Sequence, residues 1–268
     1  MKFLTKEDWE RILNKLGFNK NNMKETAVEK VFYEISQRMK RITIKNALDH
    51  TTYGIGMTLF HYYICFNDIR NIDKVEICYA CLYMSLKIQF VKDAHRIIED
   101  YIQSNKERQV NEKPDLIKYE ILLYSQLGYD LDIETPFHFF YSMVPYIIQI
   151  FPSINTMVKL DKLKHFCFNL LSDTYTRPLS IYYHPKIIFL SALLYTIRFL
   201  DFTDCDINKL IKNENLDLIS ECMEKIYQIF SRYIEDNTNT NKNVNTNKDN
   251  KNNNDNNNTE INNINKNI

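Results

Sequence analysis

The chain has 268 residues and 44% of them are hydrophobic, so it can bury a sizeable core. It contains only four Gly and six Pro, which argues against turn-rich all-β folds and against Gly-rich phosphate-binding loops. The formal net charge is zero, whereas nucleic-acid-binding surfaces usually carry a basic excess. We therefore expect an all-α protein that makes no direct contact with nucleic acid.

Residues 1–22 are predicted to form an N-terminal arm with one amphipathic helix. Its apolar side chains fall on one face, and Gly17 is placed to end the helix. That face could pack on the body of the protein or bind a partner. The residues that define it are Trp9, Ile12, Leu13 and Leu16.

Hydrophobic periodicity then predicts a first set of five helices, over residues 24–41, 43–66, 73–90, 93–104 and 114–127. Gly54 and Gly56 lie inside the second of these and lower its helix propensity by about 1 kcal/mol each relative to Ala. Such a cost is often accepted where a neighbouring helix must come close. Gly128 is placed to end the fifth helix.

The helix over residues 73–90 has no polar stripe. Its sequence, DKVEICYACLYMSLKIQF, is apolar on every face through its middle. A helix of this kind normally lies at the centre of a domain, and this one is too short to span a membrane. Its one full charge near the end is Lys87, which is either a helix-end lysine reaching water or part of a site.

A second set of helices is predicted over residues 136–151, 155–174, 186–200, 206–212 and 216–235, with Pro145 kinking the first of them. The apolar helix at 186–200 can be laid over the central helix of the first set at an offset of 112 residues, which aligns Lys74 with Lys186 and Tyr83 with Tyr195. The order of elements around both helices is the same. We interpret this as a tandem duplication, the alternative being chance similarity between two apolar helices.

The remaining residues, 237–268, are about half Asn and have no hydrophobic period, so we expect them to be disordered. The predicted organisation is an arm at 1–22, a first five-helix unit at 23–132, a second at 133–236, and the tail. Nothing in the chain suggests membrane association, because no apolar stretch reaches the length of a span.

No catalytic or metal-binding pattern is present in the sequence. Cys78 and Cys81 form a C-x-x-C pair, but a zinc site needs four ligands and no second pair completes one. We expect both cysteines to pack in the core of a protein from a reducing compartment. Residues 1–20 lack the apolar segment of a secretory signal. We predict no cofactor, no metal, no small-molecule substrate and no enzymatic activity.

Several stretches resemble the cyclin box. In the first unit these are GMTLFHYYICFNDIRNID, ACLYMSLK at 80–87, and YEILLYSQLGYDLDIETPFHFF at 119–140. In the second unit, FCFNLLSDTYTRPLSIYYHPKIIFLSALLYTIRFL is similar to the second box of the transcriptional cyclins of the K, T and L types. The resemblance covers about residues 24–235 and implies a tandem cyclin-box fold, two five-helix bundles each built around a central apolar helix.

The resemblance implies a regulatory subunit that binds and activates a cyclin-dependent protein kinase by positioning its C helix. The expected setting is transcription or cell-cycle control, in the nucleus and also in the cytoplasm. Lys87 and Glu120 match the positions that pair with each other and hydrogen-bond to kinase backbone in cyclins. Ile88, Tyr124 and Tyr129 match positions that offer apolar contacts to the kinase helix. Without the resemblance, the two tyrosines would be ordinary core candidates.

The sequence also departs from the family. Residues 24–28 read Lys-Glu-Thr-Ala-Val where cell-cycle cyclins carry a Met-Arg-Ala-Ile-Leu substrate-docking patch. Recruitment of substrates through that patch is therefore not expected. Two other functions remain open from the sequence: a nucleic-acid-associated factor like transcription factor IIB, which has the same tandem fold, and a helical scaffold that binds no kinase.

Overall fold

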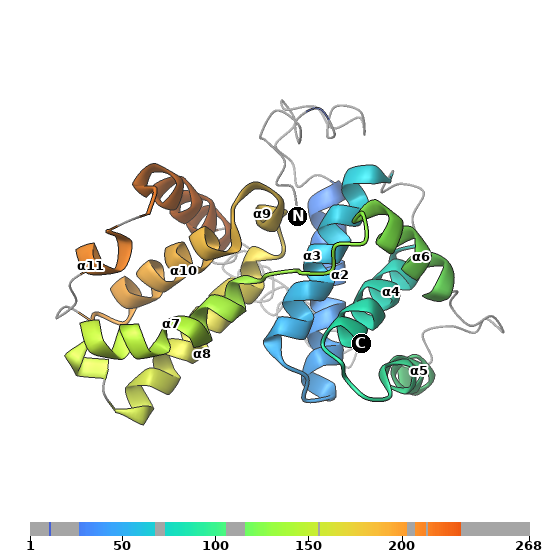
Figure 1. Cartoon of the computed structure of the whole chain (residues 1–268), viewed down its shortest axis with the longest axis horizontal. Coiled ribbons are helices and arrows are strands. Elements are labelled where there is room, and N and C mark those ends of the chain that lie inside the picture. The colour runs from blue at the N-terminus through green and yellow to red at the C-terminus, as the bar shows by residue number, and fades with distance from the viewer. Residues whose placement is uncertain are drawn as a thin grey trace, which may run out of the picture. The chain divides into compact units, whose positions relative to one another are not determined.

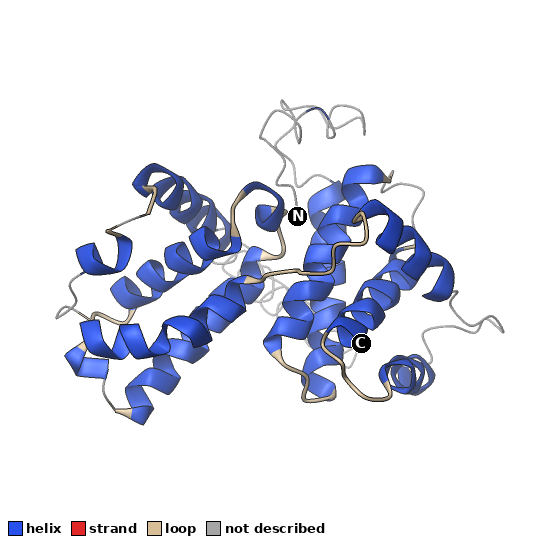
Figure 2. Ribbon diagram, in the orientation of Figure 1, coloured by secondary structure: helices blue, strands red, loops and turns tan. Residues whose placement is uncertain are grey.

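The computed structural model describes residue 11 and residues 27–67, 73–105, 116–154, 156–202, 207–212 and 214–231. Figure 1 traces the elements in chain order, and Figure 2 shows that the described elements are helices, with no strand among them. The predicted all-α fold is confirmed. No described helix is both long and apolar enough to cross a membrane. One compact unit extends to Met223, and the described part of the rest is helical residues 224–231.

The first bundle is arranged around α4 (Lys74–Ile88). Residues 77–82 of this helix are each at most 1% exposed. Asp73 caps it, and its carboxylate accepts the backbone N–H groups of Val75 and Glu76 at 2.9 and 3.0 Å. The central position predicted for this helix is confirmed, because it contacts all four others of the bundle, α2 (Ala27–Lys45), α3 (His50–Phe66), α5 (Ala94–Asn105) and α6 (Leu116–Gln126).

The second bundle has α10 (Pro185–Phe199) at its centre, with residues 187–194 all buried. The hydroxyl of Ser191 donates to the carbonyl of Ile219, in the last described helix, at 3.2 Å. All five predicted helices of this unit are present, and the one-turn α9 is additional. The elements are α7 (Pro136–Ile150), the 3-10 turn η2 (Pro152–Ile154), α8 (Met157–Thr174), α9 (Leu179–Tyr182), α10, α11 (Ile207–Ile211) and residues 216–231.

The predicted boundary between the first two helices is wrong. The α2 helix continues to Lys45, and α3 begins only at His50. Ala47, which the periodicity places on a helix face, lies in the connecting turn with a φ of 49°. The reason is the cap of α3: the Asp49 carboxylate accepts the N–H of Thr51 at 2.7 Å, and Asp is a preferred N-cap residue.

Some predicted features lie outside the described residues. They are the apolar face of the N-terminal helix (Trp9 to Leu16) with its Gly17 stop, and the Asn-rich tail at 237–268. The domain boundaries proposed at residues 22 and 236 fall in the same undescribed parts of the chain.

The two glycines of α3 allow close packing against it, as predicted. A Cβ added at Gly54 would lie 3.0 Å from the ring of Phe137 and 3.1 Å from the methyl of Thr135, where the second bundle begins. At Gly56 it would lie 3.2 Å from the sulfur of Met39 in α2. The first glycine therefore brings α3 against the start of α7, and the second brings it against α2.

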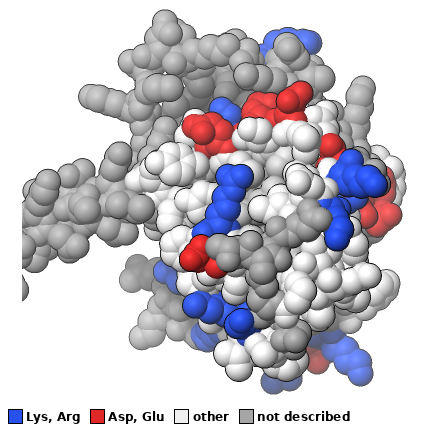
Figure 3. Space-filling model, turned by 90° about the vertical axis from the view of Figure 1, so that its left-hand side faces the viewer, with Lys and Arg blue, Asp and Glu red and all other residues white. Residues whose placement is uncertain are grey.

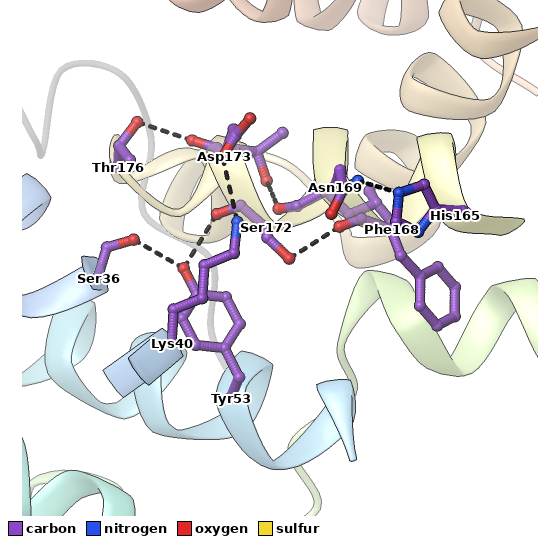
Figure 4. A network of polar contacts seen from close by, with 11 residues as sticks. Ser36, Lys40, Tyr53, His165, Phe168, Asn169, Ser172, Asp173 and Thr176 are labelled. Atoms are coloured by element: carbon purple, nitrogen blue, oxygen red, sulfur yellow. Dashed lines mark hydrogen bonds and ion pairs between the residues drawn. The ribbon is translucent and has the colours of Figure 1, made fainter. Parts of the chain in front are cut away.

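A polar network joins α2 and α3 to the end of α8 (Figure 4). The Tyr53 hydroxyl donates to the carbonyl of Ser172 at 3.0 Å, so the hydroxyl of Ser36, 2.8 Å away, donates to Tyr53. Beside it, Lys40 lies 3.7 Å from Asp173. Burial raises the pKa of the Asp173 carboxyl and the Lys40 ammonium opposes that rise. These contacts give the packing of α3 on the second bundle a fixed geometry.

His61 of α3 makes a second buried connection. It is fully buried, its Nε2 lies 3.1 Å from the carbonyl of Tyr175, and its Nδ1 lies 2.7 Å from the hydroxyl of Ser180. A carbonyl can only accept, so Nε2 carries the proton and Nδ1 accepts from Ser180. The imidazole is therefore neutral, and burial lowers the pKa of His61 to about 3.

We expect Gly54→Ala to destabilise the protein and Gly56→Ala to be neutral or stabilising. Alanine gains about 1 kcal/mol of helix propensity at either position. At Gly54 the new methyl meets the fully buried ring of Phe137, and overpacking of this kind costs about 1–3 kcal/mol. At Gly56 it meets the end of a flexible Met39 side chain, which can shift. Urea unfolding of the two variants tests this, and equal stabilities would contradict it.

The protein is expected to lose stability on mild acidification because of His61. Its pKa is about 3 in the folded state and near 6.5 when unfolded, so below about pH 6.5 the unfolded state binds the extra proton. The free energy of unfolding then falls by up to about 1.4 kcal/mol per pH unit from this group. Urea unfolding at about pH 7.5 and 5.5 measures the loss, and His61→Gln should reduce the slope.

A folded-state measurement on the wild-type chain provides the control, since the variant could fail to fold. The NMR signals of the His61 ring should stay at their neutral positions down to about pH 4.5. A ring that titrates near its ordinary pKa in the folded protein would contradict the buried neutral assignment.

Candidate functional site

Lys87 lies one residue before the end of α4, where the helix emerges from the core. Its neighbour Leu86 is fully buried, whereas the Lys87 side chain is 41% exposed. A cation in the last turn of a helix is favoured by the partial negative charge of the helix C-terminus. The ammonium also lies 5.4 Å from the centre of the Tyr83 ring, one turn earlier.

The structure brings Lys87 and Glu120 together, although they are far apart in the sequence. The Lys87 ammonium donates to Oε1 of Glu120, which lies in α6 and is 13% exposed at its side chain. This hydrogen bond is the main reason that the pKa of Lys87 is raised, and desolvation opposes it. Lys87 is therefore charged at neutral pH, and the pair forms a polar contact between the C-terminal end of α4 and the middle of α6.

Tyr124 and Tyr129 are also brought together. Tyr124 follows Glu120 by one helical turn and is half-buried, whereas Tyr129 is 75% exposed. Gly128 has a φ of 62° and ends the helix as predicted, and Tyr129 then folds back so that its N–H donates to the carbonyl of Tyr124 at 3.0 Å. The two rings stack with centroids 6.4 Å apart. Ile88, half-buried, ends α4 next to Lys87.

Two isoleucines beside this pair are exposed, which the sequence pattern does not predict. Ile117 and Ile121 are 67% and 65% exposed, although the apolar pattern of α6 suggests that they face the core with Leu116 and Leu123. Only the two leucines are buried. Ile117, Ile121 and Tyr124 are spaced by four and three residues, so they lie along one face of α6. The sequence of α6 contains more apolar residues than one buried face of a helix needs, and this excess could have indicated that some of them are exposed.

The cysteine pair has the environment of core residues. Cys78 and Cys81 are both fully buried in the middle of α4. Burial raises the pKa of the Cys81 thiol, which makes it a poor nucleophile. Within the described ranges, no group of three or more His, Cys, Asp or Glu side chains is placed to hold a metal ion.

The second bundle carries a different residue at the position that matches Lys87. The 112-residue offset aligns Lys87 with Phe199, the last residue of α10, which is 59% exposed. An ion pair is present at the other end of this helix, where the ammonium of Lys186 lies 2.5 Å from Oε1 of Glu214. Among the residues that the structure describes, the C-terminal end of α10 carries no ion pair equivalent to that of Lys87 and Glu120.

No protein-family model and no curated protein sequence matches this chain. Solved structures do match its fold. A chain from the CAK complex of Chaetomium thermophilum bound to ATP-γ-S is 17% identical with a TM-score of 0.58, over 84% of this chain and 70% of that chain. A chain from the yeast TFIIK complex (Kin28/Ccl1/Tfb3) is 16% identical with a TM-score of 0.58, over 84% of this chain and 96% of that chain. The predicted tandem cyclin-box fold is therefore confirmed.

We expect the Lys87–Glu120 pair to contribute little to stability. Partly exposed ion pairs are screened by water and typically contribute about 0–1 kcal/mol. Lys87→Ala and Glu120→Ala should each change the free energy of unfolding by less than about 1 kcal/mol in urea titrations. A loss above about 3 kcal/mol in either variant would mark the pair as structural, as for a buried pair that has lost one partner.

Proposed function

We propose that this chain is a cyclin, the regulatory subunit of a cyclin-dependent protein kinase, and that it carries out no chemistry itself. One observation carries the proposal: the Lys87–Glu120 pair is formed at an exposed edge of the first bundle. Chains of the same fold occur in the CAK and TFIIK complexes, which supports the assignment. The same likeness supports a role in transcription and a nuclear location.

The pair can hold a segment of kinase backbone. A lysine ammonium has three donors and no acceptor, and one donor of Lys87 is used by Glu120. The remaining donors suit carbonyl groups of a partner, and the second carboxylate oxygen of Glu120 suits an N–H. A pair that combines unused donors with an unused acceptor matches the two hydrogen-bonding groups of a peptide unit. Such contacts at a charged group are stronger than those between neutral groups.

The residues around the pair supply apolar contact. Ile88, Tyr124 and Tyr129 are proposed to pack against the kinase C helix, together with the exposed Ile117 and Ile121. Binding hot spots combine such apolar and aromatic anchors with a polar group that becomes desolvated in the complex. The surface around Lys87 and Glu120 can therefore offer both hydrogen bonds and apolar contacts, as specific interfaces do.

Activation would follow from preferential binding to one kinase conformation. A kinase is active when its strand lysine pairs with the glutamate of its C helix and its activation loop is ordered. A cyclin that binds the inward position of that helix more tightly shifts the population towards it. A shift from about 1:99 to 99:1 requires roughly 5.5 kcal/mol of preference, which an interface of ordinary size can provide.

The first experiment identifies the kinase by affinity purification of the chain and mass spectrometry. We then expect Lys87→Ala and Glu120→Ala to weaken kinase binding by at least about tenfold, because each leaves its partner charge unpaired in the complex. Calorimetry measures the affinity, and a kinase assay measures the loss of activation.

Lys186→Ala is the matched control. It removes an ion pair of the second bundle whose side chains are 39% and 19% exposed, close to the 41% and 13% of the Lys87–Glu120 pair. It should bind and activate the kinase like the wild type. Equal binding by all three variants would refute the site, and repeated recovery of no kinase would favour a scaffold. A salt-sensitive shift of DNA would instead favour a nucleic-acid-associated factor.

A further inference from the structure

Two exposed phenylalanines contact each other on neighbouring helices of the second bundle. Phe166 of α8 and Phe199 of α10 have ring centroids 5.4 Å apart and an interplanar angle of 43°. Their exposed fractions are 36% and 59%. The helices that carry them are in contact, and both have buried side chains, which include Leu163, Cys167 and Leu194. The two rings themselves lie outside the buried core and form an apolar surface.

The side chains around this aromatic pair are mainly cationic. Lys159 and Lys162 precede Phe166 by seven and four residues, which places them on the same face of α8. Arg198 adjoins Phe199 in the last turn of α10. Among the described residues, none of these three cations forms an ion pair. Asp201, which is exposed, is the acidic residue nearest to Phe199 in the sequence. Three cations and one carboxylate therefore lie near the pair, which leaves an excess of positive charge.

The acidic group on this face of α8 is already neutralised. Asp173 follows Phe166 by seven residues and is paired with Lys40 of α2 at 3.7 Å. It is therefore engaged in the network between the bundles, whereas Lys159, Lys162 and Arg198 are available to an incoming group. Near the aromatic pair, three cations therefore stand against one carboxylate, that of Asp201.

We propose that Phe166 and Phe199, with Lys159, Lys162 and Arg198, form a docking site for an acidic amphipathic segment of a partner protein. The segment presents one aromatic or aliphatic side chain to the two rings and carboxylates to the three cations. Two packed helices form a ridged surface on which a short helix can lie, and its apolar anchors then recur at three- and four-residue spacing. The charges fix its orientation and accelerate its association. The site is distinct from the proposed kinase contact and does not depend on it.

Nucleic acid fits these observations less well than an acidic peptide. Binding of phosphates needs a continuous basic groove, whereas the whole chain has a net charge of zero. The side of the molecule that carries α11 is mostly neutral, with basic and acidic side chains dispersed over it (Figure 3). Three cations around two rings match the size of a peptide anchor rather than that of a nucleic-acid strand.

The test uses a phage-displayed library of random 16-residue peptides, selected on the full chain and depleted on the Phe199→Ala variant. We expect the selected peptides to share an aromatic or large aliphatic residue with Asp or Glu three or four residues away. The best one, made synthetically, should bind Phe199→Ala at least about tenfold more weakly by fluorescence anisotropy, as for loss of a hot-spot residue. The double charge reversal Lys159→Glu with Lys162→Glu should weaken it as well.

Phe66→Ala is the matched control, because Phe66 is 60% exposed, as Phe199 is at 59%, but lies at the end of α3. It should leave peptide affinity unchanged. The proposal is overturned if no peptide is enriched, if the enriched peptides are basic or uncharged, or if the best peptide binds Phe199→Ala and the wild type equally. A single-stranded oligonucleotide that binds in a Phe199-dependent way, where no acidic peptide does, would also overturn it.

Discussion

Burial of α4 on every side is the constraint on which the first bundle depends. A helix without a polar stripe must be covered all round, and α2, α3, α5 and α6 provide that cover. A charged side chain of α4 is then acceptable only near an end, where its head reaches water and a carboxylate from a covering helix. Lys87 and Glu120 occupy that place. The position of the proposed kinase contact therefore follows from the packing of the bundle.

The same constraint explains how much of the fold could be predicted. Because α4 and α10 are apolar on every face, the sequence alone identifies them as central helices. Gly128 likewise marks the end of α6. The junction of α2 and α3 could not be placed by periodicity, because it is set by the Asp49 cap, a local hydrogen bond. The buried bonds of Tyr53 and His61 join residues 119 and 114–119 positions apart, and no sequence pattern specifies such partners.

The candidate site was predictable in part for a related reason. Lys87 stands out as the one full charge near the end of an apolar helix, whereas Glu120 was predicted only through the resemblance to the cyclin box. Their pairing follows once α4 and α6 are adjacent. Ile117 and Ile121 could not be recognised, because an apolar side chain has the same sequence signature whether it faces the core or a partner. Only the exposed fractions of 67% and 65% separate them from the buried leucines of α6. Exposure depends on the tertiary packing, which the spacing of residues alone does not determine.

The two bundles carry different side chains at the C-terminal end of the central helix. In the first, the polar pair of Lys87 and Glu120 lies among exposed apolar residues. In the second, the apolar contact of Phe166 with Phe199 lies among cations. A partner that offers peptide hydrogen bonds suits the first surface, whereas a partner that offers carboxylates around an apolar anchor suits the second. Each surface disfavours the partner of the other, because docking at the wrong one would leave charges desolvated without a counterpart. The tandem duplication predicted from the sequence, followed by divergence, would thus give one chain two selective surfaces without any change in the packing of its cores.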